Sequence, residues 1–132
     1  MRINREPCQS CPYRVSCPSG VWAAEEYEKL RRYDYEYDAD GRPELATFLC
    51  HLSSRIGETV CRGWLAVHSD SLAVRLMQIR GKVTADELRR KPLARLYASG
   101  NAAADAGLRG IRRPGRNARA MAARLIKRGV GR

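Results

Sequence analysis

The chain has 132 residues, which is the length of one domain, and it contains no run of about 18 apolar residues that would span a membrane. Its formal net charge is +11, and nine Lys or Arg but no Asp or Glu lie between Ala106 and Arg132, so the rest of the chain carries +2. A near-neutral body with a basic end favours an acidic partner, either nucleic acid or an acidic protein face. A solvated basic helix face is the alternative.

The five cysteines are Cys8, Cys11, Cys17, Cys50 and Cys61. The polar start "MRINREPCQS" lacks the apolar core of a secretory signal, so we expect a cytoplasmic location, where thiols stay reduced. An odd number of cysteines also argues against a closed disulfide framework. Clustered thiols in a reducing compartment favour metal binding or redox chemistry.

Helical patterns follow an N-terminal loop of about 18 residues. The expected helices cover residues 21–33, 71–81, 84–90 and 98–110, and a last one begins at Pro114. Ser19 is the expected N-cap of the first helix, and Ser69 or Asp70 that of the second. Leu72, Leu76 and Ile79 form the expected buried face of the second helix. Thr84, with Glu87 three residues on, has the spacing of a capping box.

The last helix has an apolar stripe that requires a partner surface. The stripe consists of Ala118, Met121, Ala122, Leu125 and Ile126. The basic residues that we expect to contact nucleic acid are Arg112, Arg113, Arg116, Arg119, Arg124, Lys127 and Arg128. We therefore predict a mainly α, small and irregular metal-stabilised domain over residues 1–110. A basic C-terminal helix over residues 111–132 packs on it or extends from it.

The spacing Cys8-x2-Cys11 allows two thiolates to converge on one ion, and Cys50 and Cys61 complete a tetrahedral set of four cysteines. Cys17 is the surplus cysteine and an alternative ligand. The same thiolates would hold either a [4Fe–4S] cluster or one Zn²⁺, and a proline directly after a ligand cysteine is typical of ferredoxin-type loops.

Two histidines and two tryptophans lie near the cysteine segments. His51 is expected to donate a hydrogen bond to a ligand sulfur, and both His51 and His68 are alternative zinc ligands. Trp64 and Trp22 are expected to cover the site and exclude solvent.

Several motifs resemble an uncharacterised family of small proteins from actinobacteria and their phages. They are "PCQSCPYR", "FLCH", "CRGWLAVH", "LYASGNAAADAGLRGI" and "PGRNARAMAARLIKR", in that order and over nearly the whole chain. The resemblance implies no activity. It implies that Cys8, Cys11, Cys50 and Cys61 form the cysteine set and that Cys17 lies outside it.

A shorter stretch, "CQSCPYRVSC", is similar to the cluster loop of WhiB-like regulators. That resemblance implies a [4Fe–4S] cluster with Cys8, Cys11 and Cys17 as ligands, a sigma-factor partner and a basic C-terminal end on DNA. The chain departs from the pattern, because WhiB-like proteins have their remaining cysteine upstream and none precedes Cys8 here.

These observations favour a metal-binding accessory protein that acts as a binding module on DNA, RNA or a component of the transcription machinery. An iron–sulfur redox sensor or enzyme, or a structural-zinc protein that binds an acidic host protein, are the alternatives. No phosphate-binding Gly-rich loop, paired catalytic carboxylates or Ser/His/Asp arrangement is recognisable, so an enzyme is disfavoured. The acids Asp34, Glu36, Asp38 and Asp40 are interpreted as a solvated loop.

Overall fold

A computed structural model of the chain describes residues 2–50 and 59–129, and these residues form a small, mainly helical and irregular fold, as predicted. The helices are α1 (Ala24–Glu28), the 3₁₀ helix η1 (Lys29–Asp34), α2 (Arg62–Val67), α3 (Leu72–Ile79), α4 (Ala85–Arg89), α5 (Gly100–Leu108) and α6 (Arg116–Lys127). Two short strands, β1 (Arg2–Ile3) and β2 (Thr59–Val60), pair in parallel. None of the helices in these two ranges is long and apolar enough to cross a bilayer.

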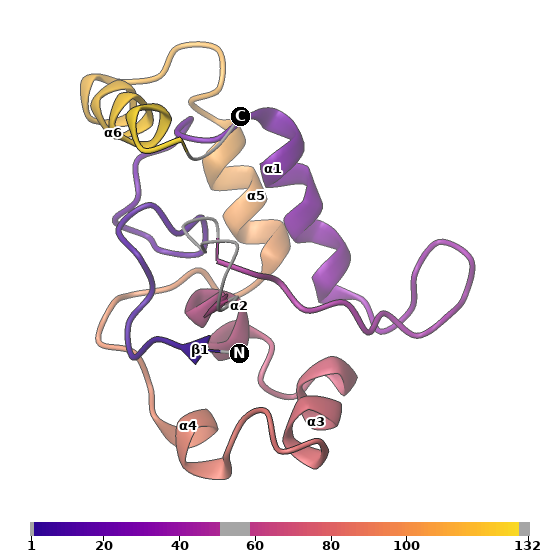
Figure 1. Cartoon of the computed structure of the whole chain (residues 1–132). Helices are drawn as coiled ribbons and strands as arrows, with labels where there is room; N and C mark the ends of the chain where they lie inside the picture. Colours follow the sequence, from indigo (N-terminus) through magenta and orange to yellow (C-terminus); the bar gives the residue numbers. More distant parts are fainter. Residues whose placement is uncertain (1, 51–58, 130–132) are drawn as a thin grey trace.

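The helices α1 and α5 lie side by side, with α6 at one end of the molecule and α3 and α4 at the other (Figure 1). Short α2 lies between the end formed by α6 and the end formed by α3 and α4, beside β1. The largest fully buried side chains are Trp22, Trp64, Tyr13, Tyr27, Leu30 and Leu65. Most of this core therefore comes from the N-terminal loop, the α1 region and α2, and the longer helices close around it.

The first expected helix is shorter than predicted and begins later. Ala23, and not Ser19, is the N-cap residue of α1, and the second half of the segment is 3₁₀ helix. The Ser19 hydroxyl is used elsewhere: it donates to the Ala106 carbonyl at 2.5 Å and accepts from the Gly110 N–H at 2.7 Å. Ser19 therefore ties the N-terminal loop to the end of α5, a role that depends on tertiary contacts and leaves no local pattern.

The predicted buried face of α3 is wrong. Ala73, Val74 and Met77 are buried, whereas Leu72 is 43% and Ile79 81% exposed. The helix carries apolar residues on both faces, so the helical period alone does not distinguish them. The N-cap of α3 is Ser71, whose hydroxyl accepts from the Val74 N–H, and not Ser69 or Asp70.

Most of the predicted stripe on α6 packs against the body of the protein. Ala118, Ala122 and Leu125 are buried, whereas Ile126 is 54% exposed. Pro114 lies before the N-cap residue, Gly115, and not at the first helical position. The division into 1–110 and 111–132 stays a prediction, but α6 contributes to the same core as the earlier segments.

A glycine allows α5 to approach α1 closely. A Cβ atom at Gly107 would lie 2.0 Å from a ring carbon of the fully buried Tyr27. Tyr27 has little freedom to move, because its hydroxyl accepts hydrogen bonds from the backbone N–H groups of Val21 and Trp22. The packing of the two helices thus requires a residue without a side chain at position 107.

Gly107→Ala is expected to lower the free energy of unfolding by about 3 kcal/mol, since overpacking forces α5 away from Tyr27. Urea denaturation followed by circular dichroism measures the change. The control is Gly115→Ala, where the new Cβ meets no atom within 4 Å. Replacing this N-cap glycine by alanine is expected to lower the free energy of unfolding by under about 1 kcal/mol. Equal stability of the two variants would contradict the close packing of α1 and α5.

Candidate metal centre

The N-terminal loop is built from successive turns that each end near a cysteine. The Cys11 N–H donates to the Cys8 carbonyl at 3.1 Å, the Arg14 N–H to the Cys11 carbonyl at 3.0 Å, and the Cys17 N–H to the Arg14 carbonyl at 3.0 Å. The Arg14 guanidinium closes the loop by donating to the Pro7 carbonyl at 2.6 Å. These turns bring the Cys8 and Cys11 thiols close enough for each to affect the pKa of the other.

The other two cysteines come from neighbouring extended segments. The Cys50 N–H donates to the Thr59 carbonyl at 2.7 Å, and the Cys61 N–H donates to the Phe48 carbonyl at 2.8 Å. This antiparallel pairing brings Cys50 and Cys61 toward the same edge of the core. It explains in physical terms how two cysteines eleven positions apart reach one place.

The four thiols of Cys8, Cys11, Cys50 and Cys61 meet in pairs. The Cys11 and Cys61 sulfurs are 3.7 Å apart, and the Cys8 thiol interacts with the thiols of both Cys11 and Cys50. All five cysteines are free thiols. Over residues 2–50 and 59–129, no three Cys, His, Asp or Glu side chains already have the arrangement of a finished metal site. The structure therefore shows one thiol pair in hydrogen-bond contact, Cys11 and Cys61, with the Cys8 and Cys50 thiols near it, and an ion would have to draw the four into a tetrahedron.

The surroundings of these thiols disfavour the thiolate form. The Cys61 thiol, followed by burial, raises the pKa of Cys11 well above its ordinary value, and the Cys11 thiol together with burial raises the pKa of Cys8. Ionising one thiol places negative charge beside another in a medium of low polarity. A divalent cation reverses this effect, because it displaces the protons and binds the resulting thiolates.

Cys17 makes no hydrogen bond to the other four thiols in the part of the chain that the structure describes, but it adjoins Cys8. Burial, followed by the neighbouring Cys8 thiol, raises the pKa of Cys17 to about 12, and its Sγ lies 3.7 Å from the Pro18 carbonyl oxygen. A half-buried thiol that stays protonated at neutral pH is a weak nucleophile and a poor oxidant sensor.

Both tryptophans lie against the cysteine segments. The backbone N–H of Trp64 donates to the Cys61 sulfur at 3.5 Å, and Trp64 is 1% exposed. The Trp22 indole N–H donates to the Ser10 carbonyl at 2.7 Å, within the turn between Cys8 and Cys11. These rings exclude water from the thiols, and the N–H of Trp64 orients one of them.

The position two residues after Cys61 and directly before Trp64 requires a glycine, Gly63. A Cβ atom at this position would lie 2.7 Å from the Cys11 sulfur and 2.9 Å from the Tyr13 Cβ. The first turn of α2 therefore passes directly against the N-terminal loop. Only a residue without a side chain allows the Cys11 and Cys61 sulfurs to approach each other there.

The hydrogen bond expected from His51 to a ligand sulfur stays a prediction, because His51 lies outside the described residues. The Nε2 of His68 lies 3.3 Å from the Tyr13 hydroxyl and 3.5 Å from an Asp34 carboxylate oxygen. Among the described residues His68 makes no hydrogen bond to a thiol, so its role as an alternative zinc ligand also stays a prediction.

The predicted basic residues are all exposed. They are Arg112, Arg113, Arg116, Arg119, Arg124, Lys127 and Arg128. Helix α6 also adjoins the cysteine loop: a hollow of about 250 Å³ is lined by Gln9 and Ser10 on one side and by Met121, Arg124 and Leu125 on the other. The loop that carries two of the thiols is thus a direct neighbour of the basic helix.

Two charged side chains, Arg62 and Glu6, hold the N-terminal segment and have no recognisable sequence pattern. The buried Arg62 donates to the Arg5, Glu87 and Arg90 carbonyls, and the Glu6 carboxylate accepts from the Leu93 and Ala94 N–H groups at 2.8 and 2.9 Å. These backbone N–H groups lower the pKa of Glu6. Charged residues usually indicate a surface, so neither role has a sequence signal.

Residues 3–125 match the family of unknown function DUF6283, and the chain belongs to this family. The expected membership of an uncharacterised family is thereby confirmed, while the actinobacterial or phage origin stays a prediction. No curated protein and no solved structure matches the chain. Its chemistry must therefore be inferred from its own residues.

Cys50→Ser is expected to weaken zinc binding by at least about 100-fold, because it removes a donor and not only an orienting group. The matched control is Cys17→Ser, which removes a half-buried thiol outside the group of four and leaves the affinity unchanged. Competition with a chromophoric chelator measures both. Equal losses in the two variants, or a loss confined to Cys17→Ser, would contradict the assignment of the ligands.

Gly63→Ala tests the close approach of α2 to the N-terminal loop. The added methyl group displaces the Cys11 sulfur from Cys61, so the zinc affinity is expected to fall by about tenfold or more. The same chelator competition measures this change. A variant with full affinity and an unchanged melting temperature would show that the loop and α2 are less tightly packed than described.

Proposed function

We propose that this protein is a metal-stabilised binding module, in which Cys8, Cys11, Cys50 and Cys61 hold one Zn²⁺ and the face of α6 binds nucleic acid. The metal would be structural, fixing the N-terminal loop against the segments that carry Cys50 and Cys61. The basic side chains of α6 would contact phosphates. Such contacts supply affinity and orientation without reading the base sequence.

The distance between the Cys11 and Cys61 sulfurs supports a single ion. With Zn–S bonds of about 2.3 Å, tetrahedral geometry separates two ligand sulfurs by about 3.8 Å. The observed separation is 3.7 Å. In a [4Fe–4S] cluster each cysteine binds a different iron, which spreads the sulfurs more widely. The separation is compatible with a single ion, and a hydrogen-bonded thiol pair has the same separation without one, so the [4Fe–4S] cluster and the redox sensor remain the alternatives.

The proposed binding function rests on the exposed positive charge of the C-terminal segment. All seven predicted basic side chains are exposed, and none pairs with a carboxylate in the described part of the chain. Three arginines, Arg109, Arg113 and Arg116, also line a hollow of about 620 Å³ at the start of α6. This helix has no side-chain cap and no acidic residue in its first turn, so its positive end adds to the field of the arginines.

The metal centre would hold one wall of this arginine-lined hollow in place. Pro18 and Ser19, which follow the cysteine loop, form part of the same arginine-lined hollow. Fixing the loop with an ion therefore also fixes one wall of the hollow. The partner would be DNA or RNA, with an acidic face of a transcription component as the competing partner, in a cytoplasm that keeps the five thiols reduced.

Replacing Arg113 and Arg116 by Gln is expected to weaken binding to all nucleic-acid sequences alike. It should reduce the magnitude of the slope of log K against log salt by about 1.5, since two phosphate contacts are lost. Fluorescence anisotropy with labelled duplex DNA and single-stranded RNA, at several salt concentrations, measures the slope.

The matched control replaces Arg75 and Arg80 by Gln. These two arginines are equally exposed but lie on and directly after α3, at the other end of the molecule (Figure 1). Net charge falls by the same amount in both variants, so a specific role for α6 requires a larger effect of the Arg113 and Arg116 changes. Equal effects of the two pairs, or no binding by the wild type at low salt, would refute the nucleic-acid interface.

A further inference from the structure

The hollow of about 250 Å³ between the cysteine loop and α6 combines an apolar surface with positive charge. Half-buried Met121 and buried Leu125 line it, and so do the exposed Arg124 and Arg128. These four residues have the spacing i, i+3, i+4 and i+7, so they occupy one face of the helix. The hollow therefore differs from the one at the start of α6, which is lined by arginines without a large apolar side chain.

The opposite wall of the hollow is a well-held part of the cysteine loop. The turn that carries Gln9 and Ser10 is fixed by two hydrogen bonds: the Cys11 N–H donates to the Cys8 carbonyl at 3.1 Å, and the Trp22 indole N–H to the Ser10 carbonyl at 2.7 Å. Gln9 is exposed, and its amide makes no hydrogen bond within residues 2–50 and 59–129. This wall thus offers an amide donor and an amide acceptor beside the apolar surface.

The two hollows follow each other along the same stretch of α6. Asn117 and Ala118 line the arginine-lined hollow and precede Met121 by one turn of the helix, on the same face. Asn117 and Arg124 are seven positions apart, which corresponds to about 10 Å along the helix axis. Stacked nucleotides of one strand cover this length in about three steps. A single strand can therefore reach both hollows at once.

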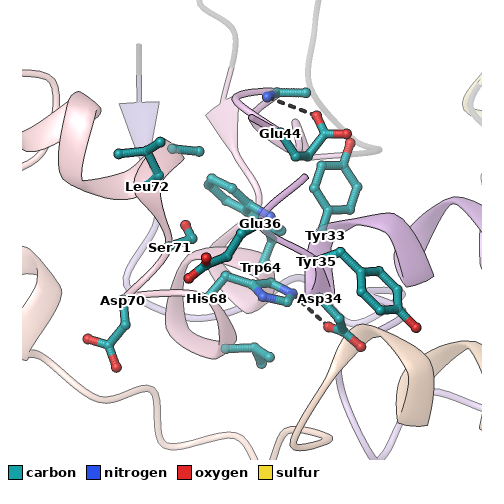
Figure 2. Close-up of a pocket in the computed structure, with 13 residues that line it drawn as sticks. Tyr33, Asp34, Tyr35, Glu36, Glu44, Trp64, His68, Asp70, Ser71 and Leu72 are labelled. Atoms are coloured by element: carbon teal, nitrogen blue, oxygen red, sulfur yellow. Dashed lines mark hydrogen bonds and ion pairs between the residues drawn. The ribbon is translucent and has the colours of Figure 1, made fainter. Parts of the chain in front are cut away.

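Another hollow, of about 230 Å³ beside α2 and α3, has the opposite charge. The carboxylates of Asp34, Glu36, Glu44 and Asp70 line it (Figure 2). None of the described residues that line it is Lys or Arg, and none belongs to α6. Phosphates are repelled there, so a nucleic-acid strand is expected to follow α6 and to avoid the acidic hollow.

We propose that the hollow between Gln9 and Met121 takes one unstacked base of a single-stranded nucleic acid, whose phosphates lie on the arginines of α6. The inference rests on the proposed nucleic-acid function and narrows it to single strands. Apolar side chains and guanidinium groups stack on the face of any base, and the Gln9 amide meets the hydrogen-bonding edge. A duplex keeps its bases stacked inside. An acidic peptide matches the charge but offers no planar ring with a polar edge.

Fluorescence anisotropy with the full-length protein at one low salt concentration tests the proposal. The labelled probes are an oligothymidylate, an abasic strand of the same length and a duplex. The abasic strand carries the same phosphates but no bases, so it measures the phosphate contacts alone. The oligothymidylate is expected to bind at least about fivefold more tightly than the abasic strand.

Met121→Ala is expected to abolish this difference, because it removes the apolar surface on which the base stacks. The affinities for the abasic strand and the duplex should stay unchanged. The matched control is Ile126→Ala, which shortens an apolar side chain of the same helix that is 54% exposed and does not line the hollow. This control should keep the full difference.

A second variant, Gln9→Ala, covers the case in which Met121→Ala lowers the melting temperature. Gln9 is exposed on the loop, so its replacement should leave the fold intact. It is expected to reduce the difference between the two strands by about twofold or more, since the base loses hydrogen bonds at its edge.

The outcomes separate this proposal from the broader one. Equal affinities of the oligothymidylate and the abasic strand, or a full difference in both Met121→Ala and Gln9→Ala, would overturn the base site while the phosphate interface stands. No binding of any nucleic-acid probe would overturn both. A glutamate-rich peptide with one leucine is the competing ligand. If it displaces the labelled strand at a lower concentration than unlabelled oligothymidylate does, the occupant is an acidic protein segment and the proposal is wrong.

Discussion

Contact between the Cys11 and Cys61 sulfurs joins the first loop of the chain to its middle, and the other parts of the fold depend on where that loop lies. The loop also holds the segment before α5, because the Val15 N–H donates to the Arg95 carbonyl and the Tyr97 N–H to the Tyr13 carbonyl. The hydrogen-bonded turns of this loop are short and irregular, so few of its contacts reach the segments that carry Cys50 and Cys61. An ion shared by four thiols would add a stabilising link between these segments.

The two ends of the molecule then have different roles. At one end, α6 presents arginines without described carboxylate partners beside a wall formed by Pro18 and Ser19. At the other end, Asp34 joins α5 to a hollow of negative charge. Separation of the two charges along one small body prevents them from neutralising each other. It leaves a cationic face at α6 and an acidic hollow beside α2 and α3.

The sequence was informative where a pattern depends on neighbours along the chain. The capping box of Thr84 and Glu87, the helical stripe on α6 and the C-x2-C turn are all local, and each is present in the structure. The four cysteines were chosen from their spacing and from a family resemblance, and the structure brings their thiols together in pairs.

Other features depend on contacts between distant segments and have no local signal. Ser19 resembles an N-cap residue but binds the end of α5, and the short acidic segment from Asp34 forms the wall of a hollow only after α2 and α3 pack beside it. On α3, apolar residues occur on both faces, so the period did not identify the buried one. Tertiary packing decides which helix face is buried and which hydroxyl caps a helix, and the pattern of residues along the chain carries no information about that packing.

The most direct test of the central claim is a metal analysis of the protein purified without oxygen, combined with its ultraviolet–visible absorption spectrum. If Cys8, Cys11, Cys50 and Cys61 hold one ion, the sample is colourless and contains one zinc per chain. A brown sample with about four irons per chain would contradict the single-ion site and restore the iron–sulfur interpretation. A folded protein free of both metals would contradict the metal centre altogether.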